Sequence, residues 1–501
     1  MTTADGTTQQ PASVRSLIPA RIDRLPWSPF HTRMVLALGS CWILDGLEIT
    51  IASNVGEKLS DSSRLGISTT FVGLLATVYL VGQVVGALVF GQISDRLGRR
   101  KLFFITLAIY FGGSALTAVT LGSGVGSISF LYLTRFIAGA GIGGEYAAIN
   151  SAIDELIPAP YRGRTDVIVN GTYWAGATIA AVIQIPLLSG AISPTFDWRI
   201  AFLIGPVLAL VIIFLRRSVP ESPRWQIMHG RGEAAEQSIA FIEHEVQSST
   251  GKDVEPVDDA MAIEIRPTPQ AGYLTLLRIL FRTYPGRSTL GATLMITQSF
   301  LYNAIFFSYA IVLTHFYLGP DADTSIYYIP FAVGNFLGPL LLGRLFDTWG
   351  RRQMISGTYL LAGSLLVISA FLFRAGVLDA TTQTVAWCII FFFASAGASA
   401  AYLTVSEIFP MEVRAKAIAV FFAIAQVFGA VAPLIYAVMI GPKDAPSTSG
   451  LFWAYILGAA VMIVGGIVAA VLGVAAERKS LEDVATPLSV VRATGVGGVG
   501  T

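Results

Sequence analysis

The chain has 501 residues, of which 54% are hydrophobic and only 13% are charged, about half the charged share of an ordinary soluble domain. The net charge of +1 gives no sign of a nucleic-acid partner. The apolar residues form runs near the roughly 20 residues that a helix needs to cross a bilayer, so the composition excludes a soluble protein and predicts an integral membrane protein embedded in lipid.

We predict an all-α membrane protein with twelve transmembrane helices, because the apolar runs are too long for strands and contain frequent Gly and Ala. The first six helices are expected near residues 33–55, 69–90, 101–121, 127–150, 165–189 and 198–216. The second six are expected near residues 288–314, 325–343, 352–374, 382–406, 414–440 and 451–474.

The predicted domains follow from these helices. They are an N-terminal cytoplasmic segment, a first six-helix bundle, a cytoplasmic bridge, a second six-helix bundle and a cytoplasmic tail, at residues 1–32, 33–216, 217–287, 288–474 and 475–501. The first segment is polar and lacks the apolar core of a cleavable signal peptide.

The bridge is expected to hold two amphipathic helices. One covers residues 234–246, and the other covers 273–282, where Arg278 and Arg282 lie beside an apolar face that suits the inner membrane surface. Residues 250–270 are rich in Asp, Pro and Thr, so we interpret them as a plain linker. We also interpret the Gly- and Val-rich end after Leu481 as a disordered tail.

Lys and Arg are distributed unevenly between alternate connections. The side that holds both predicted termini carries 27 of them and the opposite side carries 5, and with Arg135, inside a predicted helix, these account for all 33. Cytoplasmic loops of membrane proteins are enriched in Lys and Arg. We therefore expect both termini to be cytoplasmic, in a plasma membrane or bacterial inner membrane.

Two motifs recur at a constant offset of 252 residues. GQISDRLGRR begins at Gly91 and GRLFDTWGRR at Gly343, while DELIPAPYRGR and SEIFPMEVRAK place Glu155 and Glu407 at the same offset. This register indicates a duplicated six-helix unit. Parallel repeats of this kind occur in secondary transporters, which bind their solute between the halves near mid-membrane.

These motifs resemble the major facilitator superfamily over nearly the whole chain. GQISDRLGRR is similar to its signature between helices 2 and 3, and the E-x6-R spacing and PESPRW at 220–225 resemble the sugar-porter branch. The resemblance implies the major facilitator fold and a secondary active transporter that works by alternating access.

The doubled motifs predict a cytoplasmic gate. A salt-bridge network there would form when the inside closes and break when it opens, and exposed pairs of about 0–1 kcal/mol each would bias the equilibrium without locking it. The alternative is that the arginines only set topology. The resemblance supports the gate role for Gly91, Asp95, Arg99, Glu155, Arg162, Gly343, Asp347, Arg351, Glu407 and Arg414.

Four ionisable residues inside the first-half spans are not doubled. Asp45, Glu48, Arg135 and Glu145 correspond to Thr297, Phe300, Trp387 and Gly397. Charges inside a membrane are costly and usually face a cavity or a partner. We expect Asp45 or Glu145 to carry a coupling proton that Arg135 tunes, with Glu48 on the face of Asp45; a structural ion pair is the alternative. Related metabolite:proton symporters resemble this chain in having an acid in helix 1 and a G-G-E segment in helix 4.

The predicted solute site combines amide and aromatic side chains. Such groups bind small polar or aromatic solutes by hydrogen bonding and stacking, although packing is the alternative role for each ring. The sugar-porter pattern is only partly kept, since Thr297, Phe300 and Leu301 depart from it and the terminal P-E-T-K-G is missing. The candidates are Asn170, Tyr173, Trp174, Gln298, Tyr302, Asn303 and Tyr402, with Tyr79 and Gln83 as weaker ones.

We therefore predict a proton symporter of a small organic solute, either a sugar or an organic acid-like metabolite. An uncoupled facilitator and a non-transporting solute sensor are the alternatives. No phosphate-binding loop, metal-ligand cluster or nucleophile–base signature indicates an enzyme, a cofactor or a metal. We expect the protein to function as a monomer.

Overall fold

The computed structural model describes residues 14–59, 65, 69–122, 124–187, 192–216, 219–265, 272–319, 324–441, 445–488 and 490–493. The first half of the molecule consists of six long helices. They are α2 (Pro29–Leu59), α3 (Thr69–Leu97), α4 (Arg99–Ala118), α5 (Val125–Leu156), α6 (Ala159–Leu187) and α7 (Asp197–Arg216).

The second half again has six long helices. They are α11 (Pro285–Leu313), which continues into a π-helical turn at Thr314–Leu318, α12 (Ser325–Leu342), α14 (Arg351–Arg374), α15 (Ala380–Glu407), α16 (Arg414–Ile440) and α17 (Thr448–Leu472), with the one-turn α13 (Leu345–Thr348) before α14. Within the described residues, eleven helices are long and apolar enough to cross a membrane, and a twelfth span bends by 44° between Phe306 and Ser308. The twelve predicted helices are confirmed.

Several helices extend beyond the predicted apolar runs at one end of the molecule. The helix expected at 127–150 ends at Leu156, and the one expected at 69–90 ends at Leu97. The added turns carry charged side chains, such as the fully buried Asp154 and Glu155, whose contacts lie inside the protein. A hydropathy run ends where these charges begin, so it underestimates the helix.

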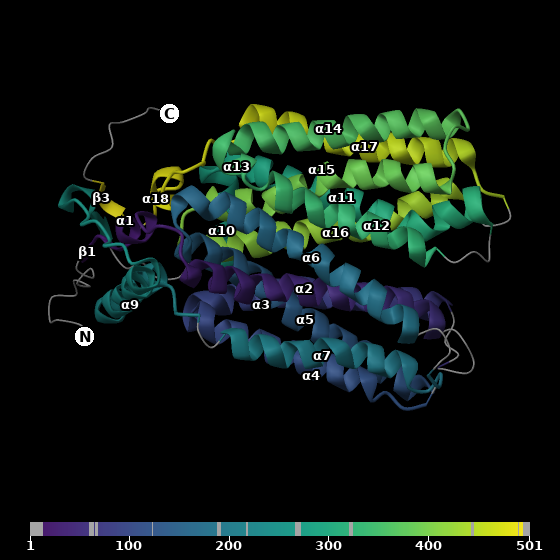
Figure 1. Cartoon of the computed structure of the whole chain (residues 1–501), viewed down its shortest axis with the longest axis horizontal. Coiled ribbons are helices and arrows are strands. Elements are labelled where there is room, and N and C mark those ends of the chain that lie inside the picture. Colours follow the sequence, from purple (N-terminus) through teal and green to yellow (C-terminus); the bar gives the residue numbers. More distant parts are fainter. Residues whose placement is uncertain are drawn as a thin grey trace.

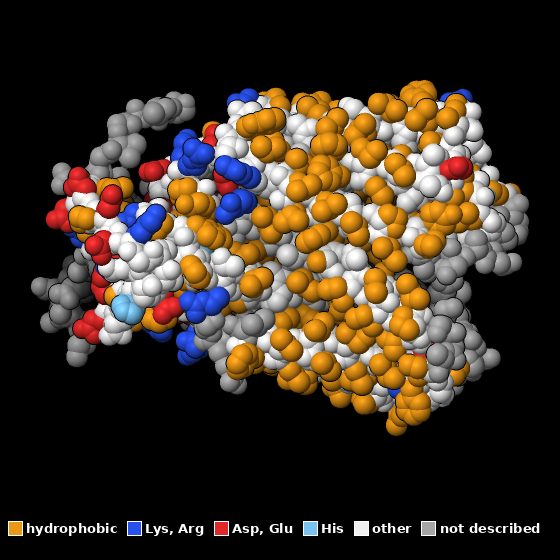
Figure 2. Space-filling view, viewed as in Figure 1, with side chains coloured by type: hydrophobic (Ala, Val, Ile, Leu, Met, Phe, Trp, Pro, Cys, Tyr) orange, Lys and Arg blue, Asp and Glu red, His pale blue; other side chains and the backbone are white. Residues whose placement is uncertain are grey.

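The two halves lie side by side with their helices roughly parallel (Figure 1). Packing is most extensive within each half, as between α3 and α5 or α14 and α17, while α6 packs on α12 and α15, and α16 packs on α3 and α5, across the interface. Hydrophobic side chains cover the flank of the molecule, and charged ones gather at one end, which we call the charged end (Figure 2).

Short elements form a separate layer at that charged end. They are α1 (Ile18–Asp23), α8 (Pro223–Met228), α9 (Gly232–Thr250), a 3₁₀ turn at Asp259–Met261, α10 (Tyr273–Arg278) with a π-helical turn at Ile279–Thr283, and α18 (Leu481–Val484). Three strands, β1 (Val14–Ser16), β2 (Ile263–Ile265) and β3 (Val490–Ala493), pair antiparallel in the order β1-β2-β3. We call this layer the terminal layer.

The terminal layer corrects two expectations. The predicted linker at 250–270 contains the 3₁₀ turn and β2, and the predicted disordered tail contains α18 and β3. Residues 494–501 lie outside the described residues. Strands of three or four residues carry no readable alternation, and their pairing joins both ends of the chain to the bridge, so local sequence could not predict the sheet. The residues 234–246, where an amphipathic helix is expected, lie within the longer α9.

Candidate functional site

A cavity lies between the two halves and is lined by residues of both. With its open part included, it measures about 870 Å³. All seven predicted solute-binding residues line it: Asn170, Tyr173 and Trp174 from α6, Gln298, Tyr302 and Asn303 from α11, and Tyr402 from α15. The remaining polar or aromatic lining side chains include Trp42, Gln83, Tyr146, Ser299, Phe306, Ser395, Ser399 and Gln426.

Asp45 is the only acidic or basic residue among the described residues that line this cavity. Its carboxylate accepts hydrogen bonds from the Tyr79 hydroxyl at 3.1 Å, from Gln83 Nε2 at 2.9 Å and from the Tyr146 hydroxyl. Three donors from α3 and α5 therefore hold one carboxylate of α2 at the cavity wall. Tyr79 and Gln83, the weaker sequence candidates, serve as its partners.

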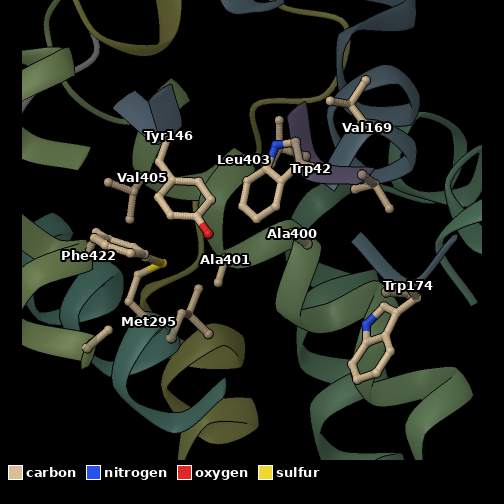
Figure 3. Close-up of a cluster of buried hydrophobic side chains, with 14 of the residues drawn as sticks. Trp42, Tyr146, Val169, Trp174, Met295, Ala400, Ala401, Leu403, Val405 and Phe422 are labelled. Atoms are coloured by element: carbon tan, nitrogen blue, oxygen red, sulfur yellow. The ribbon is translucent and has the colours of Figure 1, made fainter. Parts of the chain in front are cut away.

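Aromatic rings form two groups around the cavity. In the first, Tyr146 lies between Trp42 and Phe422 of the second half, with both ring-centroid distances at 4.6 Å. In the second, Trp174 lies 5.7 Å from Tyr302 across the halves. Figure 3 shows Trp42, Tyr146 and Phe422 together, with Trp174 apart from them. The cavity thus offers flat apolar surfaces beside amide groups.

Hydrogen bonds cross the cavity between the halves. Gln426 on α16 donates from Nε2 to Gln83 Oε1 at 3.3 Å, and its Oε1 accepts from the Ser299 hydroxyl at 3.3 Å. Because Gln83 also donates to Asp45, an unbroken chain runs from α11 to the carboxylate. The sequence interpretation missed Gln426, although a glutamine inside the apolar α16 is a signal for it.

Glu48 and Arg135 form a buried ion pair inside the first half, away from the cavity lining. Glu48 also accepts hydrogen bonds from Tyr110 at 2.9 Å and Ser114 at 3.0 Å. The Arg135 guanidinium lies 4.7 Å from the ring centre of Phe202. The structure thus places Arg135 against Glu48 rather than against Asp45 or Glu145, and no cation lies among the described cavity-lining residues.

Glu145 is buried on α5 and accepts a hydrogen bond from Thr106 of α4 at 3.4 Å. It is absent from the described cavity lining, so Asp45 and Glu145 do not share one site. A part for Glu145 in proton coupling stays a prediction.

The predicted gate contains the same ion pair in each half. Arg99 contacts Glu155 at 2.9 Å, and Arg351 contacts Glu407 through two hydrogen bonds of 3.0 Å. All four side chains are buried. The turn before each arginine needs glycine, because Gly98 and Gly350 have φ values of 88° and 114° in the region that other residues rarely adopt.

Other predicted gate residues connect the two halves. Asp347, which also pairs with Arg351 at 2.7 Å, accepts hydrogen bonds from the backbone N–H groups of Gly163 at 3.2 Å and Arg164 at 2.7 Å. Arg162 of the first half lies 3.9 Å from Glu407 of the second. These contacts hold α6 against α13–α15 at the charged end.

The remaining gate candidates are Gly91, Gly343, Arg414 and Asp95, and their surroundings differ. A Cβ added at Gly91 would lie 2.9 Å from the Ala419 Cβ, so glycine permits α3 to approach α16. A Cβ added at Gly343, by contrast, would lie 2.6 Å from the Pro339 carbonyl oxygen of α12, the helix that ends just before it. Arg414 is buried and donates to the Phe409 carbonyl at 3.3 Å. The side chain of Asp95 lies outside the described residues, so its role stays a prediction.

The terminal layer contacts the gate, which the sequence interpretation missed. Asp23 on α1 binds Arg162 at 3.2 Å and Arg224 at 3.1 Å, and Arg224 also lies 3.3 Å from Glu482 of α18. Burial alone would lower the pKa of Arg224, but the carboxylates of Glu482 and Asp23 raise it above its ordinary value. The sequence contained a signal for these ion pairs, namely the arginine of PESPRW and the acids near each terminus.

Two buried acids were also missed, Asp154 on α5 and Asp166 on α6. Asp166 lies within the predicted span 165–189 and therefore belonged with the intramembrane charges. Asp154 follows the predicted helix end at residue 150, so it did not count among the intramembrane charges. Among the described residues, no group of three His, Cys, Asp or Glu side chains could hold a metal ion.

Comparisons with known proteins agree with this architecture. Residues 42–487 match the family described as sugar (and other) transporter. The niacin transporter NiaP of Acinetobacter baylyi is 26% identical over 467 residues, covering 93% of this chain and 99% of that protein. The inner membrane metabolite transport protein YdjE of Escherichia coli is 25% identical over 487 residues, covering 93% and 98%.

A solved structure shares the fold. The MFS (major facilitator superfamily) proton:xylose symporter XylE of E. coli, bound to 6-bromo-6-deoxy-D-glucose, matches with a TM-score of 0.73 at 20% identity, covering 91% of this chain and 98% of that chain.

Proposed function

Because this chain belongs to the sugar (and other) transporter family, it is a membrane transporter rather than an enzyme, and we propose that it moves a small cyclic organic solute together with a proton. The observation that carries the proposal is the cavity between the halves, where one carboxylate, Asp45, lies beside aromatic rings and amides with no cation among the described lining residues.

The proposed solute is a planar ring compound with a weakly acidic or neutral polar group. Trp42 and Trp174 offer faces for stacking, and Gln298 and Asn303 offer hydrogen bonds. A solute carboxylate beside an ionised Asp45 would meet like-charge repulsion, and protonation of Asp45 removes it. Binding of an acid then requires a proton on Asp45, which couples the two. A relative that is a niacin transporter supports a heteroaromatic acid of this size.

A sugar is the second candidate. Five amide side chains line the cavity and suit the hydroxyl groups of a sugar: Gln83, Asn170, Gln298, Asn303 and Gln426. Sugar binding would place no charge beside Asp45, so it would not by itself require a proton there. The two candidates therefore differ in how binding should depend on pH.

Alternating access follows from the cross-half contacts. Opening the charged end requires separation of Asp347 from the backbone of Gly163 and Arg164, and of Arg162 from Glu407. Each is a contact between surfaces that can part without unfolding either half. We propose that the charged end is cytoplasmic, on the basis of its Lys and Arg excess, and that one chain, in a cell membrane, is the functional unit.

The test is a thermal-shift measurement on the full chain in detergent at pH 5.5 and pH 7.5. The probes are nicotinate, nicotinamide and xylose, because a ligand that binds the folded state raises its apparent stability. We expect nicotinate to stabilise the protein more at pH 5.5, and the Asp45→Asn variant to lose that difference. Stabilisation by xylose alone would favour the sugar, and uptake by liposomes that ignores an imposed pH gradient would leave an uncoupled facilitator.

A further inference from the structure

A file of polar side chains leads from the cavity toward the charged end. Asn170 lines the cavity and donates from Nδ2 to Asn150 Oδ1 at 3.2 Å. Asp166 precedes Asn170 by one turn of α6, and Asp154 follows Asn150 by one turn of α5. The two acids therefore lie between the cavity and the gate.

Both acids are buried without a matching donor. Asp154 and Asp166 are each 0% exposed, and among the described residues none donates a hydrogen bond to their carboxylate oxygens. Ser406 faces Asp154 and Asn170 faces Asp166, but neither pair meets hydrogen-bond geometry. The Asn170 Oδ1, in a side chain that is also buried, has no donor within the same part of the chain.

The surrounding charges leave one cation for two acids. The charged side chains near enough to act electrostatically on the acids are Arg162 from α6, Arg351 from α14, Glu407 from α15 and Arg414 from α16, and Asp154 also acts on Asp166. Arg351 already holds Asp347 and Glu407, and Arg162 holds Asp23.

That leaves Arg414 for the pair. Its Nε and Nη1 are buried and have no hydrogen-bond acceptor within the described residues, and it faces Asp154. It also faces Glu155 and Glu482, but these pair with Arg99 and Arg224. Two carboxylates beside one uncommitted guanidinium carry one excess negative charge, and a single proton would balance it.

We propose that Asp154 and Asp166 together bind one proton while the charged end is closed, and release it to water when the halves part there. A neutral acid is far easier to bury than an unpaired carboxylate, and two buried acids that interact electrostatically cannot readily both ionise. The proton forms an O–H bond on one carboxylate and leaves to cytoplasmic water. This rests on the proposed transport cycle and adds a second proton site to Asp45.

The site exists in one half only. At the constant offset of 252 residues, Asp154 and Asp166 correspond to Ser406 and Ile418, whose side chains do not ionise between pH 5 and pH 8. The two acids belong to the half that also carries Asp45, so both proton sites move as one body.

The experiment measures pH-dependent opening of the charged end, with pH alone as the probe. Hydrogen–deuterium exchange of the full chain in nanodiscs, corrected for intrinsic rates, is followed at residues 159–170 from pH 5 to pH 8. We expect protection in the wild type to fall at least fivefold at the higher pH. The Asp154→Asn/Asp166→Asn variant, which mimics the neutral pair, should stay protected throughout.

Control variants separate this site from the others. Asp45→Asn and the exposed-site variant Glu233→Gln should keep the wild-type pH dependence. If the paired Asn variant keeps it too, or if wild-type protection does not change with pH, the second proton site is wrong.

Sodium and folding are tested separately. If sodium ions restore protection at pH 8, the site holds a metal cation and the proposal is also wrong. Should the Asn variant fold poorly, Asp166→Glu must still show the pH transition. None of these outcomes depends on the solute, so failure here is distinct from failure of the pH-gradient uptake test.

Discussion

The first and second halves share the chemistry of one end and differ at the middle of the membrane. At the charged end, Arg99–Glu155 and Arg351–Glu407 repeat the same pair over the same 56-residue spacing. In the middle, the first half buries the Glu48–Arg135 ion pair. The two halves thus carry the same ion pair at the charged end, whereas the internal Glu48–Arg135 pair occurs in the first half.

The second half fills the equivalent positions with aromatic packing. Phe300 lies 6.5 Å from the Tyr436 ring, and Trp387 lies 4.9 Å from the Tyr309 ring. Both side chains are buried. An aromatic core can replace a buried ion pair without loss of stability. We infer that the ion pair persists in the first half because of what it does rather than because the fold needs it.

The two halves share one more feature, a glutamate that follows the last helix of each half. Glu221 after α7 accepts hydrogen bonds from the backbone N–H groups of Arg99 and Arg100, and Glu477 after α17 accepts one from Arg351. Each carboxylate thus satisfies the open end of a helix. The two glutamates lie 256 residues apart rather than 252, so the constant offset does not align them.

The largest expected effect comes from breaking the first-half ion pair. Glu48→Gln leaves Arg135 buried without its partner, which should lower the free energy of unfolding by about 3–5 kcal/mol. The matched second-half change, Phe300→Leu, should cost under about 1.5 kcal/mol. Thermal unfolding followed by size-exclusion measures both. Equal losses would contradict the comparison, and the Glu48→Gln/Arg135→Leu double variant should recover most of the stability.

The next effect concerns the contacts between the halves. Asp347→Asn weakens charge-assisted hydrogen bonds to Gly163, Arg164 and Arg351, each worth about 1.5–3 kcal/mol, so the open population should rise at least about tenfold. Hydrogen–deuterium exchange at the start of α6 measures it. Asp95→Asn is the matched first-half variant. A smaller effect there would show that the gate is unequal, whereas no effect of either would remove the gate role.

A smaller effect is expected from the hydrogen bonds across the cavity. Gln426→Leu removes neutral hydrogen bonds of about 0.5–1.5 kcal/mol each, so solute affinity should fall about threefold to tenfold. Gln83→Leu should reduce affinity further, because Gln83 also donates to Asp45. Titration with whichever probe stabilises the wild type measures both. A larger loss for Gln426→Leu would mean that it contacts solute directly.

The smallest effect is expected in the terminal layer and not in the membrane helices. Burial raises the pKa of Glu243, but hydrogen bonds from Arg21 and Arg24 outweigh it and leave the pKa below its ordinary 4.5. A depressed carboxylate pKa gives stability that is present above 4.5 and is lost as pH falls through the lower folded-state value. Limited proteolysis of the N-terminal segment should therefore accelerate only in acid. Glu243→Gln should show fast cleavage at neutral pH as well.

The sequence alone determined the fold and most of the cavity wall. Hydropathy located twelve spans because lipid forces each apolar run into a helix. The constant offset identified two halves, and the amide and aromatic residues inside the predicted spans identified Asn170, Tyr173 and Trp174 as solute-site candidates, all of which line the cavity. These features depend on local periodicity, which a sequence displays directly.

Only the tertiary structure decided which charges meet. Sequence placed Asp45, Glu48 and Arg135 in the same half, but packing paired Arg135 with Glu48 and left Asp45 at the cavity. The contacts of Asp154, Asp166 and the terminal layer likewise join segments far apart along the chain. Side-chain partners are set by how helices rotate and pack against one another, and periodicity within one helix carries no record of its neighbour.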